Sequence, residues 1–462
     1  RAEHRHARDP CTRIAIVRAN KPDARDRPYA DDRAGSLSGH RVATSAREVS
    51  DALASLRPCY FQPALMFRTL TDELRRLRLT ILSLAAATLV SCGGGDSVAP
   101  RPIRFASPVE LELAQNSIAM AIGDVTGDGI ADVVMTASTP PGIDGPYGLY
   151  LFAGRVDGSL APALLVTGGA IRTCYPSSIA VGDIDGDGRN DVVVGASQCG
   201  PQVFPQSETG QLVAGPFVES AGFEALRIVD INGDGRNDVV GVGPGHSSVA
   251  LLRQDANGTL VLESPIPLNA AGALDIEAGD VNGDGRPDLV VAIFDYPPQP
   301  RIAVLLQLSD GGFSTPQFLS TQPTPSTLRT LAVAIGDLNS DGRNDVVATS
   351  GGNSPSTTMA VFYQSNDGKL EAMTSIDTYE VPAAVRIADV NGDGRADVIV
   401  EHSGWFTFGV YLQQANAALA AEQRFEAPYG GALSPQVMAV GDVNRDGRSD
   451  VLIAGFVLLQ RP

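Results

Sequence analysis

Between about residues 103 and 462, hydrophobic and polar positions follow one repeated pattern. Each unit opens with an alternating apolar segment such as 178–182, passes through a loop rich in Asp and Gly, and enters an apolar run such as 191–195. A third apolar segment, such as 303–307, leads through a Gly, Asn or Asp turn into a fourth. Four short strands per unit predict the blades of a β-propeller.

The polar loop recurs seven times, and we number the loops and blades 1 to 7. The first residues of the loops are Asp124, Asp183, Asp230, Asp280, Asp337, Asp389 and Asp442. Divided among seven units, this region gives about 51 residues per blade, a normal size for a propeller. The sequence therefore predicts an all-β, seven-bladed propeller over 103–462.

The two ends of the repeat region predict how the ring closes. The last unit stops after its third strand, within 456–462. An extra segment at 104–112 precedes the first loop, and it resembles the fourth strands at 312–316 and 424–428. We expect this N-terminal strand to complete the last blade, which removes exposed sheet edges.

Loop 2, at 183–191, has carboxylates at positions 1, 3, 5 and 9 of its nine residues. Oxygen ligands on alternate residues suit Ca²⁺, with position 7 offering its backbone carbonyl. Glycine at position 6 permits a positive φ. We predict up to seven Ca²⁺ sites, at positions 1, 3, 5, 7 and 9 of each loop: Asp124, Thr126, Asp128, Ile130, Asp132; Asp183, Asp185, Asp187, Arg189, Asp191; Asp230, Asn232, Asp234, Arg236, Asp238; Asp280, Asn282, Asp284, Arg286, Asp288; Asp337, Asn339, Asp341, Arg343, Asp345; Asp389, Asn391, Asp393, Arg395, Asp397; and Asp442, Asn444, Asp446, Arg448, Asp450.

Other calcium-binding architectures fit these loops poorly. An EF-hand needs a Glu at position 12 between two helices. Position 12 here is apolar or glycine in all seven loops, and the flanks are rich in β-branched residues. Repeat-in-toxin β-helices repeat every nine residues, so a strand–calcium loop–strand hairpin is the remaining interpretation.

The segment 180–194, Ala-Val-Gly-Asp-Ile-Asp-Gly-Asp-Gly-Arg-Asn-Asp-Val-Val-Val, resembles the FG-GAP/VCBS repeat. That family forms seven-bladed propellers similar to the head of integrin α chains. The resemblance covers about 103–462 and implies calcium in the hairpin loops and partner binding by the opposite face. It leaves the function open, because propellers serve adhesive, lectin, structural and enzymatic roles.

The first 102 residues predict a leader and a tether. Residues 1–65 are rich in Arg, Asp and Ala, which favours an unstructured leader or sequence upstream of the true start. Residues 66–92 combine a basic segment, the apolar run 79–90 and a small residue before Cys92, as export signals do. The end, Leu-Val-Ser-Cys, resembles a bacterial lipobox, which implies lipidation of Cys92 and anchoring to the outer membrane. An ordinary cleaved signal and an uncleaved anchor are the alternatives, and 93–102 is expected to be a flexible tether.

The formal net charge is −18, and the seven loops hold 22 carboxylates. Seven bound Ca²⁺ would bring the charge to about −4, so we interpret the acidity as metal-site charge. The blades have no basic patch, which argues against a nucleic-acid partner.

Cys174 and Cys199 lie on either side of loop 2 at similar distances, and we predict that they form a disulfide.

Catalytic patterns are weak in this sequence. His246 and His402 have no second ligand at metal spacing and are expected to be exposed loop residues, and there is no G-x-S-x-G or P-loop pattern. A glycosidase-like carboxylate pair stays open. Tyr147, Tyr296 and Trp405, in connections opposite the calcium loops, are candidate ligand contacts, although Tyr147 and Trp405 would serve equally well as packing between blades.

These observations predict a calcium-binding propeller, exported and lipid-anchored at the bacterial cell envelope or secreted. We expect it to be a binding or scaffold module for adhesion or for recognition of a protein or carbohydrate, and not an enzyme. The membrane would be contacted only through the lipid anchor. The alternative is a polysaccharide-acting propeller enzyme, a lyase or hydrolase, which would need an acid/base pair in the central channel.

Overall fold

The computed structural model describes residues 103–112, 117–138, 147–197, 199–220, 222–243, 247–294, 301–323, 328–353, 357–428 and 434–462. These residues form an all-β fold in which the single helical element is the short 3₁₀ turn Ala170–Arg172. No helix among them has the length and apolar character needed to span a membrane. The leader, signal and tether predicted for 1–102 lie outside the described residues, as do His246 and Tyr296.

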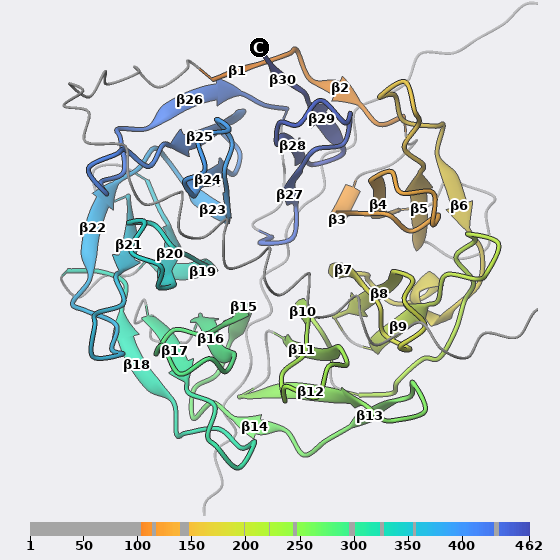
Figure 1. The fold of residues 1–462 in the computed structure, drawn as a ribbon, viewed down its shortest axis with the longest axis horizontal. Helices are drawn as coiled ribbons and strands as arrows, with labels where there is room; N and C mark the ends of the chain where they lie inside the picture. Colours follow the sequence, from red (N-terminus) through yellow and green to blue (C-terminus); the bar gives the residue numbers. More distant parts are fainter. Residues whose placement is uncertain are drawn as a thin grey trace, which may run out of the picture. The chain divides into compact units, whose positions relative to one another are not determined.

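The strands form seven antiparallel blades, each ordered from an inner strand to an outer strand (Figure 1). Blades 1 to 3 contain β3 (Ser117–Gly123), β4 (Asp132–Ser138), β5 (Tyr147–Phe152) and β6 (Leu164–Val166); β7 (Ser178–Gly182), β8 (Asp191–Ala196) and β9 (Gly200–Phe204); and β10 (Ala225–Val229), β11 (Asp238–Val242), β12 (Ser248–Gln254), β13 (Leu260–Leu262) and β14 (Ile266–Pro267). In blade 2 the outer position is taken by residues 212–218, whose backbone bonds to β9 and the residues after it.

Blades 4 to 7 repeat this order. They contain β15 (Ala273–Gly279), β16 (Asp288–Ile293), β17 (Arg301–Leu305) and β18 (Gln317–Ser320); β19 (Arg329–Gly336), β20 (Asp345–Gly351), β21 (Thr358–Phe362) and β22 (Thr374–Asp377); β23 (Pro382–Ala388), β24 (Asp397–His402), β25 (Thr407–Tyr411) and β26 (Gln423–Glu426); and β27 (Met438–Gly441), β28 (Asp450–Ile453), β29 (Phe456–Leu458) and the N-terminal β2 (Val109–Glu110).

The inner strands form a closed ring. Contacts run from β3 through β7, β10, β15, β19 and β23 to β27, and β27 contacts β3 again (Figure 1). The hydrophobic core of the described residues divides into seven clusters, one at each seam between adjacent blades. At the seam of blades 7 and 1, Leu452 and Val457 pack with Met135 and Phe152. The prediction of a seven-bladed propeller is confirmed.

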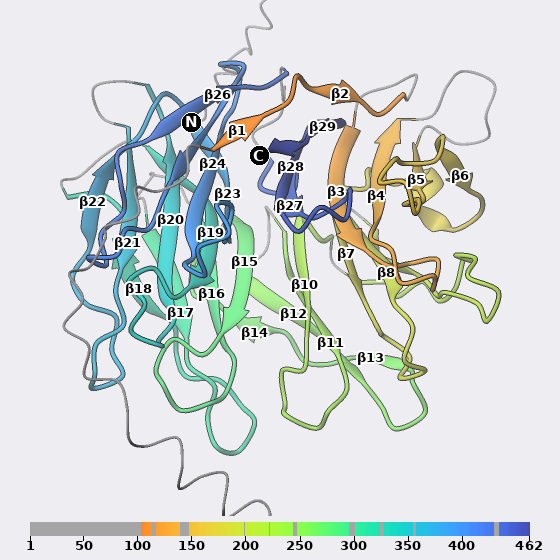
Figure 2. The ribbon, with the colours of Figure 1, turned by 45° about the horizontal axis from the view of Figure 1, so that its top comes forward.

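The N-terminal segment closes the last blade, as the sequence predicted. β2 pairs with β29 as the outer strand of blade 7, and β1 (Arg104–Phe105) pairs with β30 (Gln460–Arg461), so the beginning and end of the propeller lie side by side (Figure 2). The Phe105 ring packs edge-on against Phe408 and Phe425 of blade 6, with ring centroids 5.1 and 5.0 Å away.

A glycine before most loops allows the inner strands to approach closely. A Cβ at Gly123 would lie 2.6 Å from Val181 of the next blade, and one at Gly336 would lie 2.8 Å from Ile387. The branched side chain of one blade therefore occupies the space left by the glycine of the preceding blade. This packing accounts for the Gly-Asp pair that opens five of the seven loops.

Cys174 and Cys199 form a disulfide in the structure, with their Cα atoms 6.1 Å apart. It joins the segment before β7 to the turn before β9, at the end of blade 2 that lies away from loop 2.

We predict that Phe105→Ala weakens the closure of the ring. Loss of two aromatic pairs should lower the free energy of unfolding by about 1–3 kcal/mol, as measured by chemical denaturation. Val156→Ala is the control, because Val156 is 84% exposed and its removal should change stability by less than about 0.5 kcal/mol. If both substitutions change the free energy of unfolding equally, Phe105 does not stabilise the closure of the ring.

Candidate metal centres in the seven loops

All seven loops share one backbone geometry, set by the carboxylates at positions 1 and 5. In loop 2 the Oδ1 and Oδ2 atoms of Asp183 accept the N–H groups of Gly186 and Gly188, at 2.7 and 2.9 Å. Asp187 accepts the N–H of Arg189 at 2.9 Å. The bonds from position 6 to position 1, and from position 7 to position 5, recur in every loop.

The glycine predicted at position 6 has a positive φ in every loop, as at Gly188 with φ 84°. At position 4, where loops 5 and 7 depart from glycine, Ser340 and Arg445 take φ values of 57° and 64°. The loop therefore requires the left-handed region at both positions, and the two substituted loops accept it with a side chain.

The carboxylate at position 9 is fully buried in all seven loops and joins three parts of its blade. In loop 2, Asp191 accepts the N–H of Ile184 at 2.9 Å on Oδ2 and the N–H of Gln206 at 2.8 Å on Oδ1. Equivalent bonds to the loop start and to the end of the third strand occur in the other six blades. Position 9 thus fixes the loop to the sheet, a role that the sequence did not indicate.

Burial also raises the pKa of these position-9 carboxyl groups. Desolvation raises the pKa of Asp132 and Asp238, and it raises the pKa of Asp191, Asp288, Asp345, Asp397 and Asp450 to about 6, against the lowering effect of the backbone N–H groups. In loop 2, desolvation and the neighbouring Asp187 raise the pKa of Asp185. A bound cation would relieve the repulsion between Asp185 and Asp187.

The arginine at position 7 of loops 2 to 7 has a role that the sequence interpretation missed. In loop 2 the Arg189 guanidinium pairs with Asp187, and its Nε donates to the carbonyl of Gln206 at 3.0 Å. Loops 3 to 6 repeat both contacts. The recurrence of Arg at position 7 in six loops is a visible sequence signal for such a side-chain role.

Side chains also connect six of the seven loops to the preceding loop. At position 8, Asn190 donates to the carbonyl of Asp124 at 3.0 Å, and Asn237, Asn344 and Ser449 make the same contact at their seams. Where position 8 is Pro287 or Ala396, a glutamine at the end of the third strand reaches across instead: Gln307 to Ile231 and Gln413 to Asp337. Six of the seven seams therefore have a side-chain link between loops.

The donor set suits a hard divalent cation. In loop 2, Asp183, Asp185 and Asp187 bring one carboxylate oxygen each within 4.8 Å of one another. The other loops have Thr or Asn at position 3, which also offers an oxygen. The carboxylates that accept N–H groups keep further acceptor capacity, since an ionised carboxylate has about four acceptor sites.

Comparison with known families identifies the type of repeat. Residues 124–194, 230–291 and 337–400 match the FG-GAP-like repeat. The chain carries FG-GAP-like repeats. Six of the seven loops lie within the matched segments, and the loop at Asp442 shares their geometry.

Two solved structures are similar to this chain. A protein from Lactobacillus plantarum is 18% identical, with a TM-score of 0.50, over 69% of this chain and 87% of that chain. BBS1N in complex with ARL6DN, soaked with lead, is 12% identical, with a TM-score of 0.49, over 78% of this chain and 96% of that chain. No curated protein matches this sequence.

Two of the predicted ligand contacts lie at the end of the blades opposite the loops, Tyr147 at the start of β5 and Trp405 in a connection. Trp405, between β24 and β25, is 45% exposed and meets Tyr379 edge-on, with ring centroids 6.0 Å apart. Tyr147 is half-buried and packs edge-on against Tyr175 at 5.5 Å. Trp405 therefore keeps an accessible ring, whereas Tyr147 contributes to packing.

The expectation that His402 is an exposed loop residue was wrong. His402 ends β24 and is 1% exposed. Its Nδ1 lies 3.0 Å from the carbonyl of Glu380 and its Nε2 lies 2.6 Å from a carboxylate oxygen of Glu422. A carbonyl only accepts, so Nδ1 donates to Glu380, and Nε2 faces the Glu422 carboxylate at hydrogen-bonding distance.

Carboxylates on the inner strand β15 form an ion-pair cluster in the FG-GAP-like propeller. Arg227 of β10 binds Asp275 at 3.2 Å and Glu277 at 2.8 Å. Burial raises the pKa of Asp275 against the effect of Arg227, while burial and Arg227 lower the pKa of Arg386 to about 10. Both carboxylates are engaged by one guanidinium, which makes the cluster a connection between blades.

We predict that Asn190→Ala loosens the seam of blades 1 and 2. Loss of one side-chain hydrogen bond should lower the free energy of unfolding by about 1 kcal/mol in a denaturation experiment. Asn257→Ala is the matched control, because the Asn257 amide makes an exposed contact within its own turn. A change no larger than that of the control would mean that the seam does not depend on Asn190.

Proposed function

We propose that this protein is a calcium-loaded, envelope-anchored propeller that acts as a binding or scaffold module. The observation that carries the proposal is the common geometry of the seven loops, which face one side of the FG-GAP-like blades with oxygen donors at alternate positions. Positions 1, 3, 5 and 9 would supply side-chain oxygens and position 7 a backbone carbonyl. The ion would supply positive charge that offsets the crowded carboxylates and stabilises the loops.

Recognition in this proposal uses the face away from the loops, where Trp405 has an accessible ring. An aromatic ring beside polar groups suits either a carbohydrate or a protein surface. Tyr296 belongs to the same set of proposed contacts but lies outside the described residues. The alternative of a polysaccharide-acting enzyme gains no specific support from the described residues, since Asp275 and Glu277 are both paired with Arg227.

Calcium dependence can be measured on the full chain by thermal unfolding in millimolar calcium and in EGTA. At ten times Kd, each filled site adds about 1.4 kcal/mol, so chelation should lower Tm by many degrees. Equilibrium dialysis should find one ion fewer for Asp187→Ala. Asp185→Asn should retain every ion, because it gives loop 2 the Asp-Asn-Asp arrangement of loops 3 to 7. An unchanged Tm in EGTA together with no bound calcium would refute the proposal.

Envelope anchoring depends on Cys92. In a bacterial host, the full chain should incorporate labelled fatty acid and sediment with membranes, and Cys92→Ser should abolish the label and release the protein. Cys59→Ser, in the leader, should leave both unchanged. Equal labelling of the two variants would assign the lipid elsewhere and exclude Cys92 as the anchor.

A further inference from the structure

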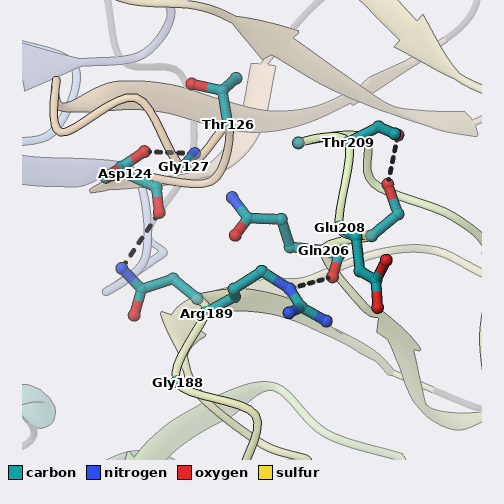
Figure 3. A pocket seen from close by; sticks show the side chains of 11 residues that line it. Asp124, Thr126, Gly127, Gly188, Arg189, Gln206, Glu208 and Thr209 are labelled. Atoms are coloured by element: carbon teal, nitrogen blue, oxygen red, sulfur yellow. Dashed lines mark hydrogen bonds between the residues drawn. The ribbon is translucent and has the colours of Figure 1, made fainter. Parts of the chain in front are cut away.

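A polar cavity of about 490 Å³ lies between loop 1 and loop 2 (Figure 3). Loop 1 contributes Asp124 and Thr126, loop 2 contributes Arg189 and Asn190, and the turn after the third strand of blade 2 contributes Gln206 and Glu208. The volume falls within the range of about 300–1,000 Å³ for small-molecule sites. All the residues that line the cavity are polar, charged or glycine, so an apolar ligand does not fit its walls.

Gln206 has a buried side-chain amide nitrogen that has no hydrogen-bond partner within the described residues. The residue is 1% exposed, and its Nε2 has no hydrogen-bond partner there. Its backbone is fixed on both sides, by Asp191 at the N–H and by Arg189 at the carbonyl. The side chain points across the cavity toward loop 1 (Figure 3), and a Cβ on Gly127 would lie 3.5 Å from its Oε1.

Comparison with other blades shows why this amide is available. Gln307, Gln413 and Gln460 occupy the same place and donate Nε2 to a carbonyl of the preceding loop. At the seam of blades 1 and 2, Asn190 already binds the carbonyl of Asp124. A buried donor without a partner costs about 1–3 kcal/mol, which a ligand hydrogen bond would offset.

The charges around the cavity select the class of ligand. Once calcium holds Asp124, the charged groups of the lining are one carboxylate, Glu208, and one guanidinium, Arg189, so the cavity favours neither an anion nor a cation. Hydroxyl groups both donate and accept, so they can bind the Gln206 donor and the exposed Glu208 carboxylate together. We propose that this cavity binds a neutral, hydroxyl-rich ligand such as a monosaccharide unit, at a site separate from Trp405. The inference deepens the proposed binding function and rests on it.

The experiment titrates the full chain, in millimolar calcium, with glucose, galactose, mannose and N-acetylglucosamine, using ligand-observed NMR and calorimetry. At least one sugar should bind, and Gln206→Ala should weaken it by about tenfold, the equivalent of one hydrogen bond. Glu208→Gln should also weaken binding, and because Glu208 is exposed it leaves the fold intact. Gln254→Ala is the matched control, since Gln254 has the same unpartnered amide in blade 3.

The result that would overturn the inference is an absence of binding by all four sugars, or binding that survives both Gln206→Ala and Glu208→Gln. Equal loss in Gln254→Ala would also overturn the assignment to this cavity. Calcium binding is measured in the same samples. A chain that binds calcium but no sugar refutes the cavity site alone, whereas a chain that binds neither refutes the calcium-loaded propeller as well.

Discussion

Burial of both faces of every blade is the constraint on which this structure depends. The second strands β8, β16 and β24 are buried along their whole length, so each sheet needs cover on both sides. The cover comes from neighbouring blades, and the core divides into one cluster per seam. Only a closed ring gives every blade two neighbours, which explains why the first strand of the propeller joins the last blade.

Burial of the blades also determines the structure of the loops, through the residue at position 9. This residue is the first of each buried second strand, so its carboxylate is buried with the strand and must find hydrogen-bond donors. The donors are the N–H groups of the loop start and of the third strand's end. The sheet therefore determines the path of each loop, and the oxygens at positions 1, 3 and 5 meet in loop 2 as a consequence of the fold.

Repeated short-range patterns explain what the sequence could predict. Alternating apolar residues, glycine at position 6 and the missing fourth strand predicted the blades, the loops and the closure. The bonds from the position-7 arginines to the third strand and from the position-8 asparagines to the preceding loop join residues 17 or more apart, as from Arg189 to Gln206 and from Asn190 to Asp124. No local period encodes such partners. His402 was misinterpreted for the same reason, because Glu422 lies 20 residues away in sequence.

Departures from the repeat occur together where the ring closes. Blade 1 has Ile130 at position 7, Ala131 at position 8 and Gly154 at the place of the third-strand glutamine. None of these side chains can donate a hydrogen bond, so blade 1 cannot link to loop 7 as the other blades link to their neighbours. Backbone pairing of β1 and β2 with the last blade is confined to this part of the ring. Pairing of the N-terminal strands with blade 7 takes the place of the side-chain links at this seam. Loop 1 can therefore differ in sequence from the other six loops.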